Sequence, residues 1–252
     1  MSKPIGWLTL NRADKHNAIT ISMWEEISHL LDIADKDPAV KVVIVRGSGT
    51  SAFASGADLR DVLDVAKGVV DRERYIRLYG DAQRALASFR KPTVAMIHGY
   101  CFGAGCGIAT ACDFRWVDER AQFGVPAAKM GQIYRLEETR RLVKLVGFSS
   151  AKRMLYTGAV MDAREAMRVG LADAVCEPES LEADTIAFVE QIASVSQFSV
   201  QTMKRIFSAI DDGRTVDDQT TIDLFLSALH GEDFEEAMAA RAEGRAPDFP
   251  FR

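Results

Sequence analysis

The sequence predicts an α/β fold whose last quarter is helical, and three observations lead to this prediction. Up to about residue 178, short apolar segments typical of buried strands alternate with segments of helical periodicity. From about residue 179 onward nearly every segment has helical periodicity. No internal repeat, low-complexity tract or long flexible linker interrupts the 252 residues. We therefore expect an α/β core over 1–178 and a C-terminal helical region over 179–252.

Composition excludes several classes of partner. The net charge of −5 and the pI near 5.5 argue against a surface for nucleic acid or anionic membranes. No apolar run approaches the about 18 residues of a membrane span, and no secretory signal pattern opens the chain. The spacing of the four cysteines fits no zinc pattern: Cys101, Cys106, Cys112 and Cys176. We expect a cytoplasmic protein without a metal or redox cofactor.

The first hundred residues contain three apolar, β-branched segments that are typical of strands, namely 5–12, 40–47 and 93–98. Ser22 and Glu25 form a capping-box pattern, which predicts a helix that ends before Pro38. A second helix is expected around 71–89, and 47–59 is expected to be a long loop rich in Gly, Ser and Ala.

The second half of the chain continues the alternation and then becomes helical. Two short strands are expected at 114–118 and 121–126, followed by two successive helices at 136–147 and 149–158. A helix capped by Asp162 and ended by Gly170 then leads to a last strand closed by Pro178. Four further helices are expected, at 180–194, 199–211, 215–230 and 232–243.

The segment 98–114 is the one around which the rest of the core is organised. It predicts a strand end, a glycine turn, and a helix that begins near Ala104. Because each helical glycine costs about 1 kcal/mol relative to alanine, a helix this rich in glycine needs to be buried. The free N–H groups at its start suit an oxygen atom that becomes negative during a reaction. Close packing of a glycine-rich helix on a sheet is the alternative interpretation.

A second glycine-rich turn, ASGADL at 54–59, follows the strand predicted at 40–47. One backbone N–H from each of the two turns could meet at a single oxygen atom, which is the arrangement of an oxyanion hole.

With both turns, the chain resembles the crotonase superfamily, also called the enoyl-CoA hydratase/isomerase family, over essentially its whole length. Six motifs follow one another in the family's order: NRADKHNAI (11–19), AFASGADL (52–59), HGYCFGAGCGIATACDFR (98–115), AQFGVPAAKMG (121–131), MDAREAMRVGLADAV (161–175) and EDFEEAMAARAEGRAPDF (232–249). Several motifs in one order are far more specific than any one of them.

The resemblance implies a crotonase-like spiral of ββα units with a C-terminal helical trimerisation region, in a homotrimer or homohexamer. It implies an acyl-CoA substrate, with coenzyme A present only as part of that substrate, and an enolate stabilised by an oxyanion hole. The amides of that hole would be those of Ala57 and Ala104. The resemblance also places Ala57, Asp58, Leu59 and Arg60 along the CoA site, and brings Lys15 near the CoA phosphates. For Lys15 and Arg60, solvated surface charge is an equal alternative.

Two positions depart from the family pattern. Hydratases of the family carry two glutamates that activate and deliver water, and the matching positions here are Gly107 and Ala127. Neither side chain can move a proton, and general acid–base groups typically contribute 10²–10⁴-fold. The family's glycine-rich pocket loop also differs, because this chain reads IYRLEETRRL over 133–142.

The altered loop supplies the remaining candidate residues. Tyr134 resembles a tyrosine of methylmalonyl-CoA decarboxylase-like members, and filling of space is its alternative. Glu137 and Glu138 could be relocated acid/base groups, but a structural role in a first helical turn, paired with Arg141, is favoured for them. Arg135 could hold a substrate carboxylate, or lie on the surface.

We weighed four functions, of which three remain. The first is a hydratase/isomerase-family enzyme with atypical acid/base residues, and the second is a methylmalonyl-CoA-type decarboxylase. The third is a non-catalytic acyl-CoA-binding protein or structural subunit, which the loss of both glutamates keeps open. The fourth, a dinucleotide-binding module, fails because Ile108 stands where its fingerprint needs the third glycine.

Overall fold

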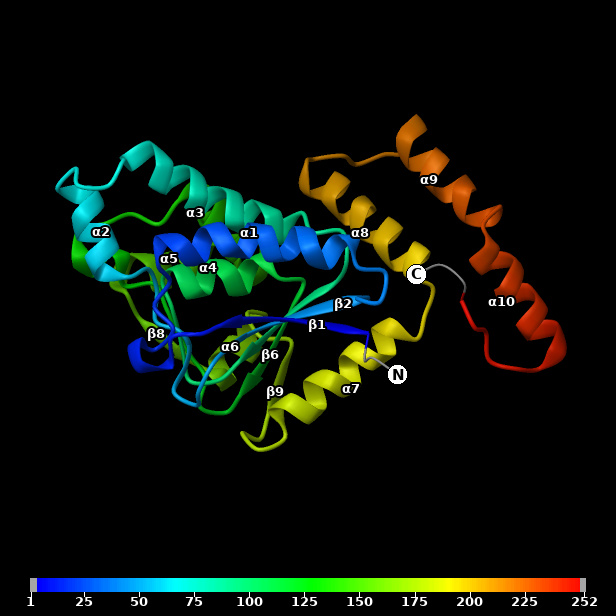
Figure 1. Cartoon of the computed structure of the whole chain (residues 1–252), viewed down its shortest axis with the longest axis horizontal. Coiled ribbons are helices and arrows are strands. Elements are labelled where there is room, and N and C mark those ends of the chain that lie inside the picture. The colour runs from blue at the N-terminus through cyan, green and yellow to red at the C-terminus, as the bar shows by residue number, and fades with distance from the viewer. Residues whose placement is uncertain (1–3, 250–252) are drawn as a thin grey trace.

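The computed structural model describes residues 4–249, and a five-stranded parallel sheet runs through its core (Figure 1). The order of the strands is β1-β2-β4-β6-β9, and every neighbouring pair is parallel. The strands are β1 (Ile5–Leu10), β2 (Val42–Gly47), β4 (Thr93–Ile97), β6 (Phe114–Asp118) and β9 (Ala174–Cys176). Both central strands, β2 and β4, are almost wholly buried, which explains their continuous apolar sequences.

A smaller sheet lies beside the first and has the order β3-β5-β7-β8. Its strands are β3 (Ala52–Ala54), β5 (Tyr100–Phe102), β7 (Gln122–Gly124) and β8 (Val160–Asp162). Three times the chain adds a strand to the large sheet and the next strand to the small one, and twice a helix follows at once. This repetition is the ββα arrangement that the sequence resemblance implied.

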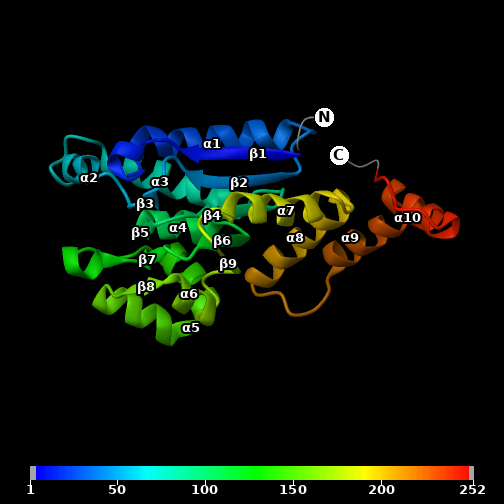
Figure 2. The same ribbon diagram turned by 90° about the horizontal axis from the view of Figure 1, so that it is seen from below.

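Helices cover the sheets and complete the core. They are α1 (Ile21–Lys36), α2 (Leu59–Ala66), α3 (Arg72–Ala87), α4 (Ala104–Ala111), α5 (Leu136–Thr157) and α6 (Ala163–Val169). Helices α1 and α3 lie side by side in Figures 1 and 2. Trp24 of α1, Phe53 and Phe123 are fully buried between these layers.

Helix α4 is the most enclosed of the helices in the described residues, since all of its residues are buried. This confirms that a helix with two internal glycines is held by its surroundings. Gly105 explains how closely it packs, because a Cβ atom built there would lie 2.6 Å from the Ala54 carbonyl oxygen of β3. Only a glycine allows that approach of helix to strand.

Three local predictions differ from the structure. Helix α1 is capped by Thr20, whose hydroxyl accepts a hydrogen bond from Met23 N at 3.3 Å, and not by Ser22. Helix α2 occupies 59–66, a segment for which no helix was predicted. The segment 47–59, which was expected to be a loop, contains strand β3. The two helices expected at 136–147 and 149–158 are confirmed, because α5 consists of two helices that meet at Gly147, where φ 71° and ψ 166° are not helical.

The C-terminal helices are α7 (Leu181–Ala193), α8 (Gln197–Asp211), α9 (Gln219–Leu229) and α10 (Glu232–Glu243). Helix α7 packs on the large sheet through Leu181 and Val189, whereas α8, α9 and α10 extend away from it (Figures 1 and 2). The division into 1–178 and 179–252 stays a prediction, and residues 1–3 and 250–252 lie outside the described part. No helix within residues 4–249 is long and apolar enough to cross a membrane.

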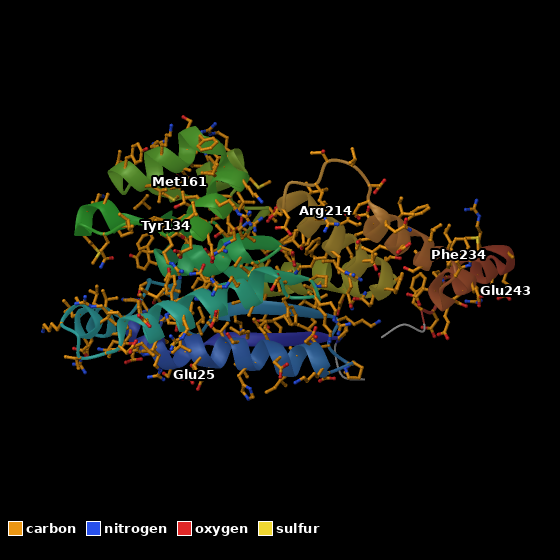
Figure 3. The ribbon with its side chains drawn as sticks, turned by 90° about the horizontal axis from the view of Figure 1, so that it is seen from above. Glu25, Tyr134, Met161, Arg214, Phe234 and Glu243 are labelled. Atoms are coloured by element: carbon orange, nitrogen blue, oxygen red, sulfur yellow. The ribbon has the colours of Figure 1, made fainter. Side chains whose placement is uncertain are left out.

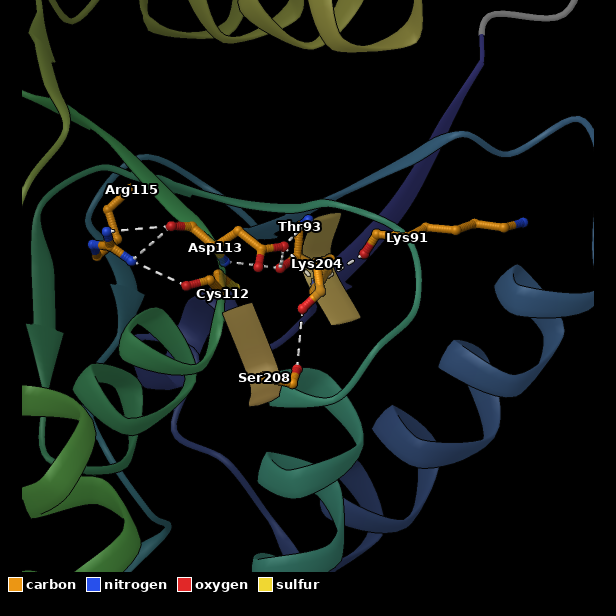
Figure 4. Close-up of polar contacts among 7 residues, drawn as sticks. All are labelled: Lys91, Thr93, Cys112, Asp113, Arg115, Lys204 and Ser208. Carbon is orange, nitrogen blue, oxygen red and sulfur yellow. Dashed lines mark hydrogen bonds and ion pairs between the residues drawn. The ribbon is translucent and has the colours of Figure 1, made fainter. Parts of the chain in front are cut away.

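An ion pair fixes α8 to the core (Figure 4). Lys204 Nζ lies 2.6 Å from Asp113 Oδ2 and donates a second hydrogen bond to the Lys91 carbonyl at 3.0 Å. The same Asp113 oxygen accepts from the backbone N–H of Thr93 at 2.7 Å, at the start of β4. Because Asp113 follows the C-cap residue of α4, Cys112, this contact also ties α8 to the end of the central helix.

Candidate active site

One large cavity, of about 1280 Å³, brings together nearly all the residues that the sequence singled out. It is bounded by η1 (Ala13–Lys15), the turns before α2 and α4, the start of α3, and the loop between η2 (Pro126–Met130) and α5. Nine of the expected site residues line it: Lys15, Ala57, Asp58, Leu59, Arg60, Ala104, Tyr134, Arg135 and Glu138. Figure 3 shows Tyr134 in the core half of the molecule, far from Phe234 and Glu243.

The two glycine turns meet at the cavity wall. Gly56 and Gly103 have φ of 119° and 51°, and a Cβ atom built on Gly56 would lie 3.9 Å from the Ala104 nitrogen. Ala104 is the first residue of α4, so its N–H has no intrahelical acceptor. Within residues 4–249 no hydrogen bond from the Ala57 N–H is recorded either. Two unused amides that face one cavity can bind a single carbonyl oxygen.

The turn that carries Ala57 is fixed by its neighbours. Its flanking residues bond to Ile19, because Ile19 N donates to Gly56 O at 2.8 Å and Asp58 N donates to Ile19 O at 2.9 Å. Arg12 Nη1 lies 2.8 Å from Asp58 Oδ2, and this hydrogen bond holds the pKa of Asp58 below its usual value. Asp58 also caps α2, so its place in the structure is that of a support for the turn.

The cavity mouth carries basic side chains. Lys15 and Arg60 both line it and are exposed, and Arg12 lies beside them. Asp14, Asp58 and Asp61 line the same cavity and Arg12 is paired with Asp58, so Lys15 and Arg60 are the basic groups that an anionic group could meet there. The apolar residues Leu59, Val62 and Ile76 line the wall. This arrangement suits a ligand with a charged end and an apolar end.

Glu138 brings a buried carboxylate into the cavity wall. The residue is only 2% exposed, and its Oε1 accepts hydrogen bonds from Tyr79 Oη at 2.5 Å and Gln83 Nε2 at 2.9 Å. Its Oε2 is buried and has no hydrogen-bond partner among the described residues. A Cβ atom built on Gly107 would overlap Glu138 Oε1, so the carboxylate of α5 occupies the space where a side chain at 107 would begin.

Tyr134 and Arg135 stand beside this carboxylate. The Tyr134 hydroxyl donates to the Gly103 carbonyl at 3.3 Å, directly behind the Ala104 amide. Burial, together with the negative charge of Glu138, raises the pKa of Tyr134 well above its usual value, so the phenol stays protonated at neutral pH. The guanidinium of Arg135 lies 5.3 Å from the centre of the Tyr79 ring.

Glu137 is the one expected site residue that does not line the cavity. Its side chain is 41% exposed and forms an ion pair with Arg84 Nη1 at 3.0 Å. The pairing expected between the first-turn acids and Arg141 is also not seen, because Arg141 donates to Gln83 instead. For Glu138 the sequence favoured a structural role in the first turn, and the structure instead buries it in the cavity wall.

Sequence reasoning missed Tyr79 and Gln83 as partners of Glu138. Both lie on α3, one turn apart, and both point to the face that Ala82 and Leu86 bury. The available signal was a glutamine within an otherwise apolar helix face. Such a polar side chain needs a buried partner.

The comparisons with known proteins agree with this geometry. The family model "Enoyl-CoA hydratase/isomerase" matches residues 1–251. The mitochondrial enoyl-CoA hydratase of Pongo abelii is 31% identical over 247 residues, which cover 97% of this chain and 83% of that protein. A crotonyl-CoA hydratase of Syntrophomonas wolfei is 31% identical over 246 residues, covering 96% and 93%.

A solved structure is also closely similar. It is an enoyl-CoA hydratase/isomerase family protein of Hyphomonas neptunium, with a TM-score of 0.95 and 31% identity, covering 100% of this chain and 96% of that one. The match of sequence and fold over the whole length, around a cavity with two unused amides, establishes the family. The protein is a member of the enoyl-CoA hydratase/isomerase family and has its crotonase fold.

Proposed function

We propose that the protein binds an acyl-CoA thioester in this cavity and that Glu138 transfers a proton at the carbon beside the thioester carbonyl. The carbonyl oxygen would accept hydrogen bonds from the Ala57 and Ala104 amides. These amides stabilise the enolate oxygen that forms when the proton leaves, and one such donor typically contributes 10²–10³-fold to kcat. Lys15 and Arg60, at the cavity mouth, would lie near the CoA phosphates.

One observation carries the proposal: the Glu138 carboxylate fills the space of the absent side chain at Gly107. By the family resemblance, that space belongs to one of the two hydratase glutamates. Three other carboxylates line the cavity, but Asp14 is exposed, Asp58 is paired with Arg12, and Asp61 accepts a hydrogen bond from Ile21 N at 2.8 Å. Glu138 is both buried and left with one unpartnered oxygen.

A single carboxylate favours a double-bond shift over hydration. In a 3-enoyl-CoA, Glu138 takes a proton from C2, and the electron pair of that C–H bond moves into a dienolate whose charge rests on the thioester oxygen. The same carboxyl group then returns the proton to C4, so the product is a 2-enoyl-CoA and nothing is added or lost. Hydration needs a second group that activates water or delivers a proton, and Ala127 lacks one.

Tyr134 supports a second candidate, the decarboxylation of a methylmalonyl-CoA-type substrate. Its protonated hydroxyl lies next to the oxyanion turn, and Arg135 also lines the cavity. Loss of carbon dioxide would leave the same enolate on the same amides. The buried Glu138 carboxylate disfavours this reaction, because it would repel the substrate carboxylate. A non-catalytic acyl-CoA-binding role would leave the relocation of this carboxylate unexplained.

Exchange of substrate protons with solvent tests the proposal without knowledge of the natural acyl group. Butyryl-CoA would be incubated with the purified protein in D₂O, and deuterium at C2 measured by mass spectrometry. We expect Glu138→Gln to lower the exchange rate by about 10²–10⁴-fold. The matched control, Glu137→Gln, changes the neighbouring exposed glutamate and should exchange at the wild-type rate. Undiminished exchange in Glu138→Gln would overturn the proposal.

A turnover panel separates the candidate reactions. It would contain a 3-enoyl-CoA, crotonyl-CoA and methylmalonyl-CoA. Conversion of the 3-enoyl-CoA supports the double-bond shift, and rapid hydration of crotonyl-CoA would show that a second acid/base group operates. Release of carbon dioxide that disappears in Tyr134→Phe would favour the decarboxylase. From the family resemblance we also propose that the protein assembles as a homotrimer or homohexamer, needs no cofactor beyond the CoA of its substrate, and acts in the cytoplasm.

A further inference from the structure

Behind Glu138 lies an arginine that has no carboxylate partner in the described part of the chain. Arg141 follows Glu138 on α5 and faces into the protein, where its Nε is buried without a hydrogen-bond acceptor. Its Nη2 donates to the side-chain oxygen of Gln83, and no ion pair of Arg141 is recorded within residues 4–249. Arg141 as a whole is half-buried, but a guanidinium with one buried, unpartnered N–H beside a neutral amide is costly unless a negative charge lies close by.

The carboxamide of Gln83 links this cation to Glu138. Gln83 is only 2% exposed, so water does not set its orientation. A guanidinium group can only donate hydrogen bonds, and therefore the Oε1 of Gln83 must face Arg141. Its Nε2 is then left to face Glu138, to which it donates at 2.9 Å. The hydrogen bond from Arg141 thus fixes the orientation of the Gln83 amide, so that its Nε2 and not its Oε1 faces Glu138.

The other groups around the Glu138 carboxylate supply little positive charge. Helix α3 presents the hydroxyl of Tyr79 and, farther away, Tyr75. The loop before α5 presents Tyr134, and α4 presents Gly107.

Two further charged residues lie nearby but are occupied elsewhere. Arg135 rests on the Tyr79 ring, on the cavity side. Glu137 turns outward to Arg84. Arg141 is thus the cation that is hydrogen-bonded, through one amide, to the carboxylate.

We infer that Arg141 is a positioning residue: it orients the Gln83 amide so that Nε2 donates to Glu138 Oε1, which leaves Glu138 Oε2 free to take a proton. The inference rests on the proposed function, because it concerns the same carboxylate. The electrostatics agree with it: burial lowers the pKa of Arg141, and the charge of Glu138 acts in the opposite direction. Burial and the charge of Glu138 also raise the pKa of Tyr79, so that this hydroxyl remains a donor.

The inference predicts the direction of a pH shift. A cation held close to a carboxylate favours the charged form of the acid, and Arg141→Met removes such a cation. A carboxylate acts as a base only in its ionised form, so the rate of C2 proton exchange rises with pH on the acid side of its profile. In Arg141→Met the pH at which the exchange rate is half its maximum should therefore increase by about one unit, because the lost charge was linked to the carboxylate by hydrogen bonds. Lysine keeps the charge, so Arg141→Lys should move it less.

The experiment uses two readouts. The first is the pH profile of C2 exchange of butyryl-CoA, measured for the wild type, Arg141→Met and Arg141→Lys. The second is an infrared titration of the carboxylate band, with Glu138 assigned by subtraction of the Glu138→Gln spectrum. Both midpoints should shift together in Arg141→Met. Arg84→Met is the matched control, because Arg84 pairs with exposed Glu137 and should leave both midpoints in place.

Each outcome decides the inference. A rate in Arg141→Met that falls equally at every pH, with both midpoints unmoved, would show a merely structural role. If Arg141→Met does not fold, Gln83→Met removes the linking amide and retains both charged residues, and its infrared midpoint should also rise. Should Glu138→Gln exchange at the wild-type rate, the proposed function fails, while the infrared titration of Glu138 still reports whether Arg141 controls its ionisation.

Discussion

Transfer of the carboxylate from α5 back to α4 is the most demanding test of the site. The perturbation is the double variant Gly107→Glu with Glu138→Ala. In the native chain a Cβ atom at 107 would overlap Glu138 Oε1 and lie 2.9 Å from Gln83 Nε2. The two positions therefore compete for one space, and a side chain can occupy it from either helix but not from both.

The structure sets the expected magnitudes. Glu138→Ala alone removes the proposed base and should reduce C2 exchange by about 10²–10⁴-fold. Gly107→Glu alone forces a second side chain into a filled space, with an overpacking cost of about 1–3 kcal/mol. This cost is partly offset by a gain in helix propensity of roughly 0.5–1 kcal/mol. In the double variant the space is vacated first, so we expect a favourable coupling of about 0.5–3 kcal/mol between the two changes.

Urea unfolding and C2 exchange would be measured for the wild type, both single variants and the double variant. We expect the double variant to be more stable than additivity predicts and to recover part of the exchange lost in Glu138→Ala. Gly107→Glu combined with Glu137→Ala is the control, because exposed Glu137 does not occupy the contested space. Additive stabilities, with no exchange recovered, would falsify the view that Gly107 and Glu138 share one position.

Three further predictions concern the supports of the site. Ala104→Pro removes one of the two amide N–H groups at the first position of a helix, where proline is tolerated. The rate of C2 exchange should fall about 10²–10³-fold, while the urea concentration at half-unfolding barely changes. A variant that exchanges at the wild-type rate would exclude this amide from the oxyanion hole. Arg12 lowers the pKa of Asp58, so Asp58 stabilises the fold above about pH 4 and loses that contribution as pH falls through its folded-state pKa. Urea unfolding would be measured at several values between about pH 2 and pH 6, the range in which carboxyl groups titrate. The free energy of unfolding should fall less steeply with decreasing pH in Asp58→Asn than in the wild type. An equally steep fall in both would contradict this prediction. Lys204→Met leaves Asp113 without its cation and should lower the free energy of unfolding by about 2 kcal/mol. The variant should also accelerate amide hydrogen exchange more in α8 than in α4. Equal acceleration in both helices would show that the ion pair does not hold α8.

The fold was largely predictable because its strongest sequence patterns coincide with its most buried elements. Strands β2 and β4 are continuous apolar runs and lie at the centre of the large sheet. Helix α2 was missed although Leu59, Val62, Leu63 and Ala66 recur at helical spacing, because this pattern spans only eight residues and none of them is buried in the core. What begins this helix is the side chain of Asp58, which accepts from Arg60 N at 2.9 Å.

The site was predictable where glycine determines the backbone and less so where tertiary contacts choose the side chain. Gly56 and Gly103 need positive φ, and their spacing revealed both amide turns. Glu137 and Glu138 are adjacent, and composition alone does not decide which one faces inward. The register of α5 does contain the answer, because Glu138 stands one turn before Leu142 and two before Val146, which are both buried.

The glycine at 107 and the glutamate at 138 are best understood as a matched pair on two packed helices. Taken alone, Gly107 is a helix-weakening residue and Glu138 is an acid in a first turn. Together they explain each other, since even an alanine at 107 would overlap the carboxylate that Tyr79 and Gln83 hold. A core that served only stability would fill this space with apolar side chains, because a buried charge network is seldom more stable than they are. The chain instead maintains a buried carboxylate with one free oxygen in the wall of the cavity that the Ala57 and Ala104 amides also line, as the proposed proton transfer would require.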